Sequence, residues 1–312
     1  MDMNGLGQTI CLLAKTCRGE PLTGQEISDA NQDRRNAVPL LPDEYVPGEE
    51  ARYFTFPPAP TALEDQPQAE PDPQPEREPE SKPTWANIHF PPSSLSRLKS
   101  LATSDLASSP VSVPYISTND VLSAFFWRTI SLTRFPHLAP SDHPSELNRQ
   151  LSARRLLGLS DGYQGHMTAS THTHLLNPHE YSLGHVAACL RRDLSDTEGL
   201  RFSVRAMATA LTRLSDAGED TRGIGYGATL DPNHDLVLSS YAEIKVCQVS
   251  FGSVLGQAVA ARRPDVNPFP CIVYVMPKDR DGGMTCSVCL RRDDMAVLRG
   301  LAEFREFAEY IG

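Results

Sequence analysis

An acidic, proline-rich stretch divides this 312-residue chain into unequal parts. Residues 57–83 contain nine prolines, interleaved with Glu, Asp and Gln, and residues 43–82 carry −8 of the chain's net charge of −10. A segment with so few apolar side chains cannot offset the entropy lost on ordering its backbone. We therefore expect three parts: residues 1–45, an acidic Pro-rich disordered linker over 46–83, and a folded domain over 84–312. A Pro-rich ligand for a partner protein is the alternative to a plain spacer.

The remaining residues are almost neutral and show no basic face, so nucleic acid and anionic membranes are poor candidates for partners. No apolar run approaches the roughly 18 residues that span a bilayer. The first residues lack the charged and then apolar pattern of a signal peptide. Seven cysteines, an odd number in a chain of this size, favour free thiols in a reducing compartment. We expect a cytoplasmic protein.

Helix and strand patterns are mixed along the chain, without a strict βαβ rhythm. The clearest helix covers 117–135, where Ser117 and Asp120 have the spacing of a capping box. Further helices are expected at 5–18, 92–102, 183–194 and 200–214, with one or two over 293–311. Strands are expected at 85–90, 149–154, 165–175, 236–240, 244–249, 271–276 and 284–290. The mixture predicts an α/β (α+β) class with a mixed sheet.

Three short patterns suggest chemistry, but each has a simpler interpretation. Cys286 and Cys289 form a CxxC inside an expected strand, where residues three apart point to opposite faces, so a zinc or redox half-site is disfavoured. His172 and His174 share a strand face but lack an obvious carboxylate partner, so packed or solvent-facing histidines are favoured over a metal site. The glycine-rich residues 223–227 match no phosphate-binding loop. We expect no metal.

Six motifs in collinear order resemble the BAHD acyltransferases, in particular the fungal branch that includes the trichothecene 3-O-acetyltransferases. They are STNDVLSAFFWR at 117–128, LSARR at 151–155 with YQGHM at 163–167, DLVLSSY at 235–241, SFGSVLG at 250–256 with RRP at 262–264, YVMPK at 274–278 with DGG at 281–283, and FREFAEYIG at 304–312. The match covers about residues 1–45 and 84–312.

This resemblance implies a chloramphenicol acetyltransferase-like fold of mixed sheets flanked by helices, with a solvent channel between two domains. It implies direct transfer of an acyl group, as acetyl, from acyl-CoA to a hydroxyl of a small secondary metabolite. Acyl-CoA is then a co-substrate, no cofactor stays bound, and the protein is expected to be a monomer. The channel residues implied are Ser239, Ser240, Phe251, Gly252 and Gly256.

The start of the chain resembles the family's HxxxD motif, in which a neutral histidine removes the acceptor's proton and the aspartate pairs with an arginine. Asp2 aligns with the aspartate, and CRGEPL at 17–22 follows as in the family. The histidine would precede Met1, and none of the nine histidines has an Asp four residues later. The resemblance thus implies a complete C-terminal domain and a mostly missing N-terminal domain. Either translation starts inside a longer gene, or the locus has decayed.

The chain also departs from the family pattern at particular positions. Ser250 replaces an aspartate whose arginine partner would be Arg154 or Arg155, so we expect that ion pair to be lost. Ser152, His166 and Val254 replace an Asp, an Asn and a Gly. Two lost acids leave positive charge without compensation, which lowers stability if the site is buried. Relaxed selection or altered substrate handling stands beside ordinary divergence as an explanation.

The resemblance therefore predicts an acyl-CoA-dependent O-acyltransferase that lacks its catalytic histidine as written. The alternative is an inactive remnant, or a pseudoenzyme that binds CoA esters or a partner. A metal-dependent hydrolase would rest only on the scattered histidines.

Overall fold

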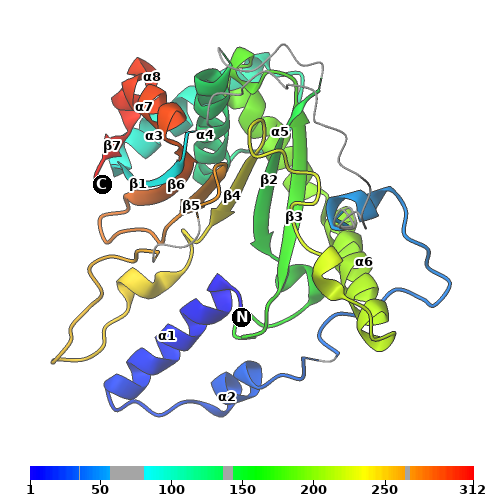
Figure 1. Cartoon of the computed structure of the whole chain (residues 1–312). Helices are drawn as coiled ribbons and strands as arrows, with labels where there is room; N and C mark the ends of the chain where they lie inside the picture. Colours follow the sequence, from blue (N-terminus) through cyan, green and yellow to red (C-terminus); the bar gives the residue numbers. More distant parts are fainter. Residues whose placement is uncertain (35, 57–80, 136–142, 264–267) are drawn as a thin grey trace, which may run out of the picture.

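One seven-stranded sheet organises the molecule (Figure 1). The structure, a computed structural model, describes residues 1–34, 36–56, 81–135, 143–263 and 268–312. The strand order is β3-β2-β4-β5-β6-β1-β7. Pairs β2–β4 and β4–β5 are parallel and the other pairs are antiparallel, which confirms the mixed sheet. The strands are β1 (Pro83–Phe90), β2 (Ser145–Ser152), β3 (Thr168–Leu175), β4 (Leu236–Ser240), β5 (Ile272–Val275), β6 (Met284–Arg291) and β7 (Glu309–Tyr310).

Helices cover one face of this sheet and bury its apolar side. The α-helices are α1 (Met3–Cys17), α2 (Gly24–Ala30), α3 (Pro92–Asp105), α4 (Thr118–Arg134), α5 (Leu183–Ser195), α6 (Thr197–Asp216), α7 (Arg292–Gly300) and α8 (Ala302–Phe307). The main core lies between the sheet and helices α3, α4, α5, α7 and α8. Phe90 packs edge-on against Phe125 and Phe126 at its centre, in the arrangement that aromatic rings prefer.

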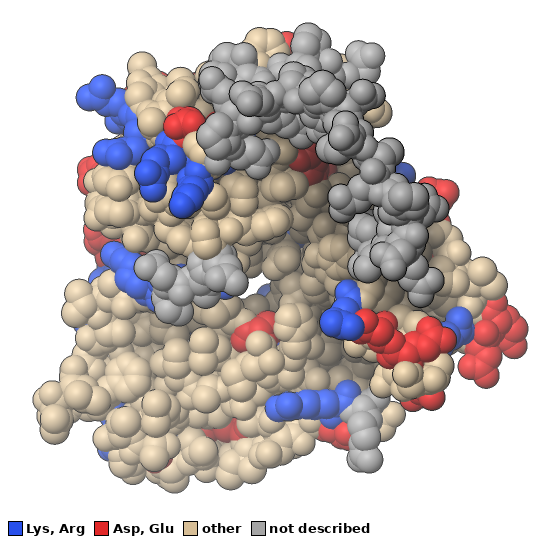
Figure 2. All heavy atoms as spheres, in the orientation of Figure 1, with Lys and Arg blue, Asp and Glu red and all other residues tan. Residues whose placement is uncertain are grey.

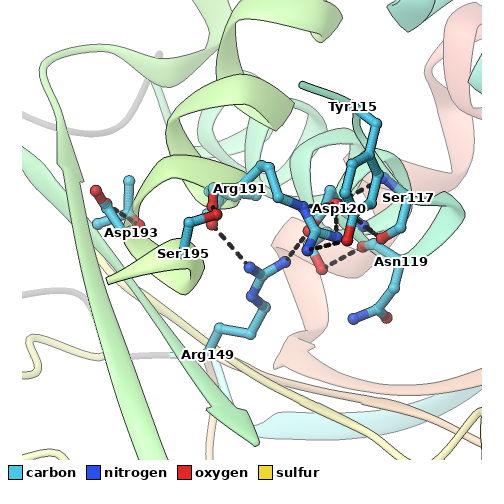
Figure 3. A network of polar contacts seen from close by, with 11 residues as sticks. Tyr115, Ser117, Asn119, Asp120, Arg149, Arg191, Asp193 and Ser195 are labelled. Atoms are coloured by element: carbon cyan, nitrogen blue, oxygen red, sulfur yellow. Dashed lines mark hydrogen bonds and ion pairs between the residues drawn. The ribbon is translucent and has the colours of Figure 1, made fainter. Parts of the chain in front are cut away.

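The capping box predicted for α4 is confirmed, and its aspartate reaches further than one helix. Ser117 accepts a hydrogen bond from the backbone N–H of Asp120, and the Asp120 carboxylate accepts one from the N–H of Ser117. The same carboxylate, fully buried, forms ion pairs with Arg149 of β2 and Arg191 of α5 (Figure 3). Arg149 also donates to the carbonyl of Leu190. One aspartate therefore joins two helices to the sheet.

Most expected elements occur near their expected limits; one assignment is wrong, and α2 and β7 were not expected. Residues 244–249 were expected to be a strand, but they contain the 3-10 helix η6 (Lys245–Gln248), which packs on α1. An alternating apolar pattern over so few residues does not distinguish a strand from a helical turn. The expected helical ending splits into α7 and α8, and the chain then adds β7 to the edge of β1.

The disordered linker expected over 46–83 is wrong for the part that the structure describes before residue 57. The 3-10 helix η1 (Glu49–Tyr53) contacts α6, and the Phe54 ring is buried with Leu41 and Ala206. A buried aromatic ring supplies apolar contact to a segment whose composition is otherwise acidic, and backbone hydrogen bonds with residues 223–225 add to it. Residues 57–80, which hold most of the prolines, lie outside the described residues.

Residues 1–45, expected to be the remnant of another domain, contact the main body at several places. Asp29 accepts a hydrogen bond from Ser160, and the Leu41 N–H donates to Thr209 of α6. In the described part of the chain, no helix combines the length and apolar character needed to cross a membrane. The thiols of Cys286 and Cys289 are both buried in β6 and unpaired.

Candidate active site

A polar row crosses the face of the sheet opposite the main core. Gln150 of β2 lies beside Ser239 of β4, which in turn lies beside Tyr274 of β5. Alternation along a strand sends these side chains away from the core that their neighbours build. They border a cavity of about 520 Å³ between the sheet and the start of α1, and Figure 2 shows the surface hollowed at this place. The cavity is also lined by Asp2, Asn4, Leu6, Ser152, His166, Thr168, Ser240, Tyr241 and Arg263, among others.

Asp2 closes one side of this cavity and accepts four hydrogen bonds from three residues. Its side chain caps α1 by accepting from the Gly5 N–H at 2.8 Å, and it accepts from the Met167 N–H at 2.7 Å. Arg154 donates to both carboxylate oxygens, at 2.9 and 2.8 Å. This two-pronged geometry is the strong form of an arginine–carboxylate pair.

The bonding of Asp2 makes it an organising residue and not a base. Burial by itself raises the pKa of this carboxyl, but the hydrogen bonds from Arg154, Gly5 and Met167 outweigh it and lower the pKa below the usual value. A carboxylate that stays charged and already accepts four hydrogen bonds has little capacity left to take a proton from a substrate. Its effect is to join the first turn of α1 to the loop before β3.

Arg154 lies beside Asp2, and its ion-pair partner differs from the one expected from the sequence. The side chain is 1% exposed, and it also donates to the carbonyls of Tyr163 and Gly165 and to the Ser152 hydroxyl. We expected Arg154 or Arg155 to lack a partner because position 250 is serine. That expectation is wrong: Asp2 compensates Arg154, and the exposed Arg155 pairs with Asp161.

Ser250 lies elsewhere, against the end of α1, where its carbonyl accepts a hydrogen bond from Arg18. Of the expected channel residues, Ser239 and Ser240 line the cavity. Phe251, Gly252 and Gly256 instead form a tight turn in which the Gly256 N–H donates to the Gly252 carbonyl at 2.8 Å. Gly252 has a φ of +92° and Gly256 a φ of +70°, conformations that suit glycine. These three residues are not among those that border the cavity.

Among the cavity residues that were not assigned a role from the sequence, His166 and Arg263 have titratable or charged side chains. His166 borders the cavity next to Met167, and one ring nitrogen lies 3.1 Å from the Thr168 hydroxyl. Partial burial lowers the pKa of this imidazole, which favours the neutral form. Arg263 comes from the RRP stretch and stacks on Tyr274. Both lie within the quoted motifs, so the signal was present, but only the tertiary structure shows which motif residues face the cavity.

A second cavity, of about 670 Å³, adjoins the first across the first turn of α1. Asn4 and Ser152 border both cavities. Arg154, Arg155, Glu243 and Lys245 line the second cavity, which is therefore richer in charge. Two cavities that meet at Asn4 and Ser152 can admit two different molecules from opposite sides of α1.

His172 and His174 lie deeper along the same sheet face and have a carboxylate partner that sequence spacing did not show. Glu146, across from His174 in the β2–β3 register, lies 2.7 Å from a ring nitrogen of His172 and 3.4 Å from one of His174. Tyr53 stacks on His172 with ring centroids 4.0 Å apart. Among the described residues no group of three or more His, Cys, Asp or Glu side chains could hold a metal ion. The histidines are packed polar residues.

Comparison with known proteins agrees with this geometry. No protein-family model matches the chain. O-acetyltransferase dmxR13 of Cryptosporiopsis sp. is 36% identical over 320 residues, which cover 100% of this chain and 65% of that protein. Trichothecene 3-O-acetyltransferase TRI101 of Fusarium sporotrichioides is 37% identical over 317 residues, covering 100% of this chain and 64% of TRI101. The chain is homologous to fungal O-acetyltransferases.

Solved structures show the same fold. TRI101 of F. sporotrichioides, crystallised with coenzyme A and T-2, superposes with a TM-score of 0.84 at 34% identity, over 100% of this chain and 65% of TRI101. Vinorine synthase, at 16% identity and a TM-score of 0.63, shares the fold. The expected acyltransferase fold is thus confirmed. The chain spans about 65% of the length of the relatives that it matches.

Proposed function

We propose that this chain forms the binding part of an acyl-CoA-dependent O-acyltransferase of the BAHD type. The reaction is transfer of an acetyl group from acetyl-CoA to a hydroxyl of a small secondary metabolite. The observation that carries the proposal is the cavity beside Asp2, in a fold that TRI101 shares and in which TRI101 was crystallised with coenzyme A and T-2. The adjoining second cavity supports entry of donor and acceptor from two sides.

The cavity has hydrogen-bonding groups suited to a polar ligand. Ser239, Ser240, Gln150 and Tyr241 supply hydroxyl and amide groups on the sheet side. Asp2 keeps the first turn of α1 against the loop before β3, so it positions the walls between which a thioester and a hydroxyl would meet. We assign Asp2 and Arg154 this positioning role, with Arg155 and Ser250 outside it.

In the HxxxD motif a histidine removes the proton from the acceptor, and the 312 residues do not include this histidine. None of its nine histidines stands four residues before an aspartate. We therefore propose that the 312-residue chain binds acyl-CoA without transferring the acetyl group. Free thiols on all seven cysteines support a reducing, cytoplasmic setting.

Calorimetric titration with acetyl-CoA tests the binding part of this proposal. Ser240→Trp fills the cavity with an indole and is expected to weaken binding at least tenfold. Ser96→Trp, on the exposed side of α3, is the matched control and should stay within twofold of the wild type. A wild-type chain that does not bind acetyl-CoA, or an S240W variant that binds as well as S96W, would contradict the proposal.

Turnover is measured with radiolabelled acetyl-CoA and deoxynivalenol, a ligand present in a solved TRI101 structure. We expect no labelled ester from the 312-residue chain. Acetyl transfer at a rate typical of enzymes would overturn the claim that a histidine before Asp2 is required. His166, the histidine that borders the cavity, would then be the base to substitute.

A further inference from the structure

Arg263 presents a rigid guanidinium at the wall of the cavity. Its guanidinium carbon lies 3.9 Å from the centroid of the Tyr274 ring. The Tyr274 ring lies nearly parallel to the rings of Trp85 and Tyr241, with ring centroids 5.9 and 5.8 Å away. Stacking on an aromatic face restricts an arginine to a plane and leaves its edge available for hydrogen bonds. The side chain is therefore oriented before any ligand arrives.

The N–H groups of the Arg263 guanidinium make few hydrogen bonds with the described residues. Among the described residues the buried Nε atom has no hydrogen-bond partner, and Nη1 makes one long contact of 3.4 Å to the Tyr241 hydroxyl. In the described part of the chain, no carboxylate forms an ion pair with Arg263. Arg154, the neighbouring buried cation, differs because Asp2 occupies both of its terminal nitrogens. Since a buried donor without a partner is costly, its presence at a cavity wall indicates a place for an acceptor.

We propose that Arg263 binds an anionic oxygen group of a ligand in this cavity, in a geometry that matches a phosphate or a carboxylate. The planar fork of arginine suits both groups, and partial burial strengthens a charge-assisted hydrogen bond relative to one in open solvent. The inference rests on the proposed function, because the anion belongs either to coenzyme A or to the acceptor. Arg263 is thus a specificity-determining residue of the cavity.

The adjacent Arg262 provides a matched control. Its side chain is exposed and donates to the carbonyl of Ala261, and it is absent from the lining of the cavity. Arg263→Gln and Arg262→Gln remove the same charge one residue apart. Arg263→Lys keeps the charge but loses the stacked planar fork. Circular dichroism and thermal unfolding of each variant show whether the fold is retained before binding is compared.

Calorimetric titrations with four ligands distinguish the two sources of the anion. Coenzyme A is compared with pantetheine, which lacks phosphate, and mandelate is compared with benzyl alcohol, which lacks the carboxylate. We expect R263Q to weaken binding of at least one anionic ligand about tenfold and to change its neutral counterpart less than twofold. R263K should fall between R263Q and the wild type, and R262Q should bind like the wild type. A loss confined to coenzyme A assigns the site to the donor, and a loss confined to mandelate assigns it to the acceptor.

Several outcomes would overturn the inference. If R263Q weakened the binding of charged and neutral ligands equally, Arg263 would only contribute to the shape of the cavity. If R263Q and R262Q weakened binding equally, the net charge of the protein would be the cause and not a contact with Arg263. A wild-type chain that binds mandelate through Arg263 but not coenzyme A would count against the proposed function alone. Normal binding of coenzyme A and mandelate by R263Q would count against the Arg263 assignment alone.

Discussion

Asp120 and Asp2 have similar structural roles, because each carboxylate joins segments that are distant in the sequence through an ion pair with arginine. Asp120 is fully buried between Arg149 and Arg191, whereas Asp2 is partly buried against Arg154. In each case burial alone raises the carboxyl pKa, and the arginines and backbone N–H groups lower it overall. Both side chains therefore remain charged at neutral pH and contribute to stability only while they are paired.

Asp120→Asn should destabilise the protein by about 3–5 kcal/mol, because it leaves the buried Arg149 without a counter-charge. Urea unfolding at pH 7 measures the change. Asp161→Asn is the control, since Asp161 pairs with Arg155 on the exposed surface and should contribute far less to stability. Similar losses for the two variants would show that the buried network is not a major source of stability.

Short elements outside the main core are held by small apolar clusters and a few hydrogen bonds. The acidic residues 49–56 follow the pattern of a solvated segment, yet Phe54 is 3% exposed in a small cluster with Leu41 and Ala206. A bridge between Thr55 and Ile224 adds one backbone connection. Whether such a short segment is ordered therefore depends more on the burial of its apolar side chains than on its average composition.

Phe54→Ala should release this segment from α6 at a cost of up to about 3 kcal/mol, in line with loss of a buried aromatic ring. Hydrogen exchange is expected to rise over residues 41–56 and to stay unchanged in α4. Phe56→Ala is the control, because the Phe56 side chain is 37% exposed. If F54A leaves the exchange of residues 41–56 unchanged, the segment has another anchor.

The whole molecule responds to pH through carboxylates on the open face of the sheet as well as in the core. Burial raises the pKa of Glu146, but hydrogen bonds with His172, His174 and Thr229 outweigh this and lower it to about 2. The same carboxylate raises the pKa of His174, against the opposing effect of burial. Arg52 and Asp235 are the other charged groups that act on His174.

The pKa of Glu146 is lowered and that of His174 is raised, which predicts a pH at which the stability from this cluster is greatest. Stability from Glu146 is fully present above its unfolded pKa of about 4.5 and is lost as the pH falls toward 2. Stability from His174 is fully present below its unfolded pKa of about 6.5 and is lost as the pH rises through the higher folded value. This cluster therefore stabilises the protein most between about pH 4.5 and 6.5.

Glu146→Gln should weaken the dependence of the free energy of unfolding on pH, both at acidic and at neutral pH. It should lower the highest free energy of unfolding by at most about 3 kcal/mol. Urea unfolding between pH 3 and 8 measures it. Glu198→Gln, at an exposed pair with Arg201, is the control and should keep the wild-type profile. A parallel shift of the E146Q curve, without loss of its slopes, would contradict the assignment of the pH dependence to this cluster.

Local hydrogen bonding and side-chain periodicity in the sequence by themselves determined much of the fold. The capping box of Ser117 and Asp120 involves residues three apart, so its outcome does not depend on the rest of the molecule. The limits of β4 also follow from a local apolar run. The ordered motifs predicted the acyltransferase fold, which the TRI101 structures share.

Contacts between side chains that are distant in the sequence could not be predicted and were found in the folded structure. It paired Arg154 with Asp2, brought Glu146 to the two histidines, buried Phe54 on α6 and stacked Arg263 on Tyr274. Each of these contacts depends on strand register or on packing between segments far apart in the chain. Spacing along one sequence does not encode such distances, because a side chain's partners are set by the face that it occupies and by what packs against that face.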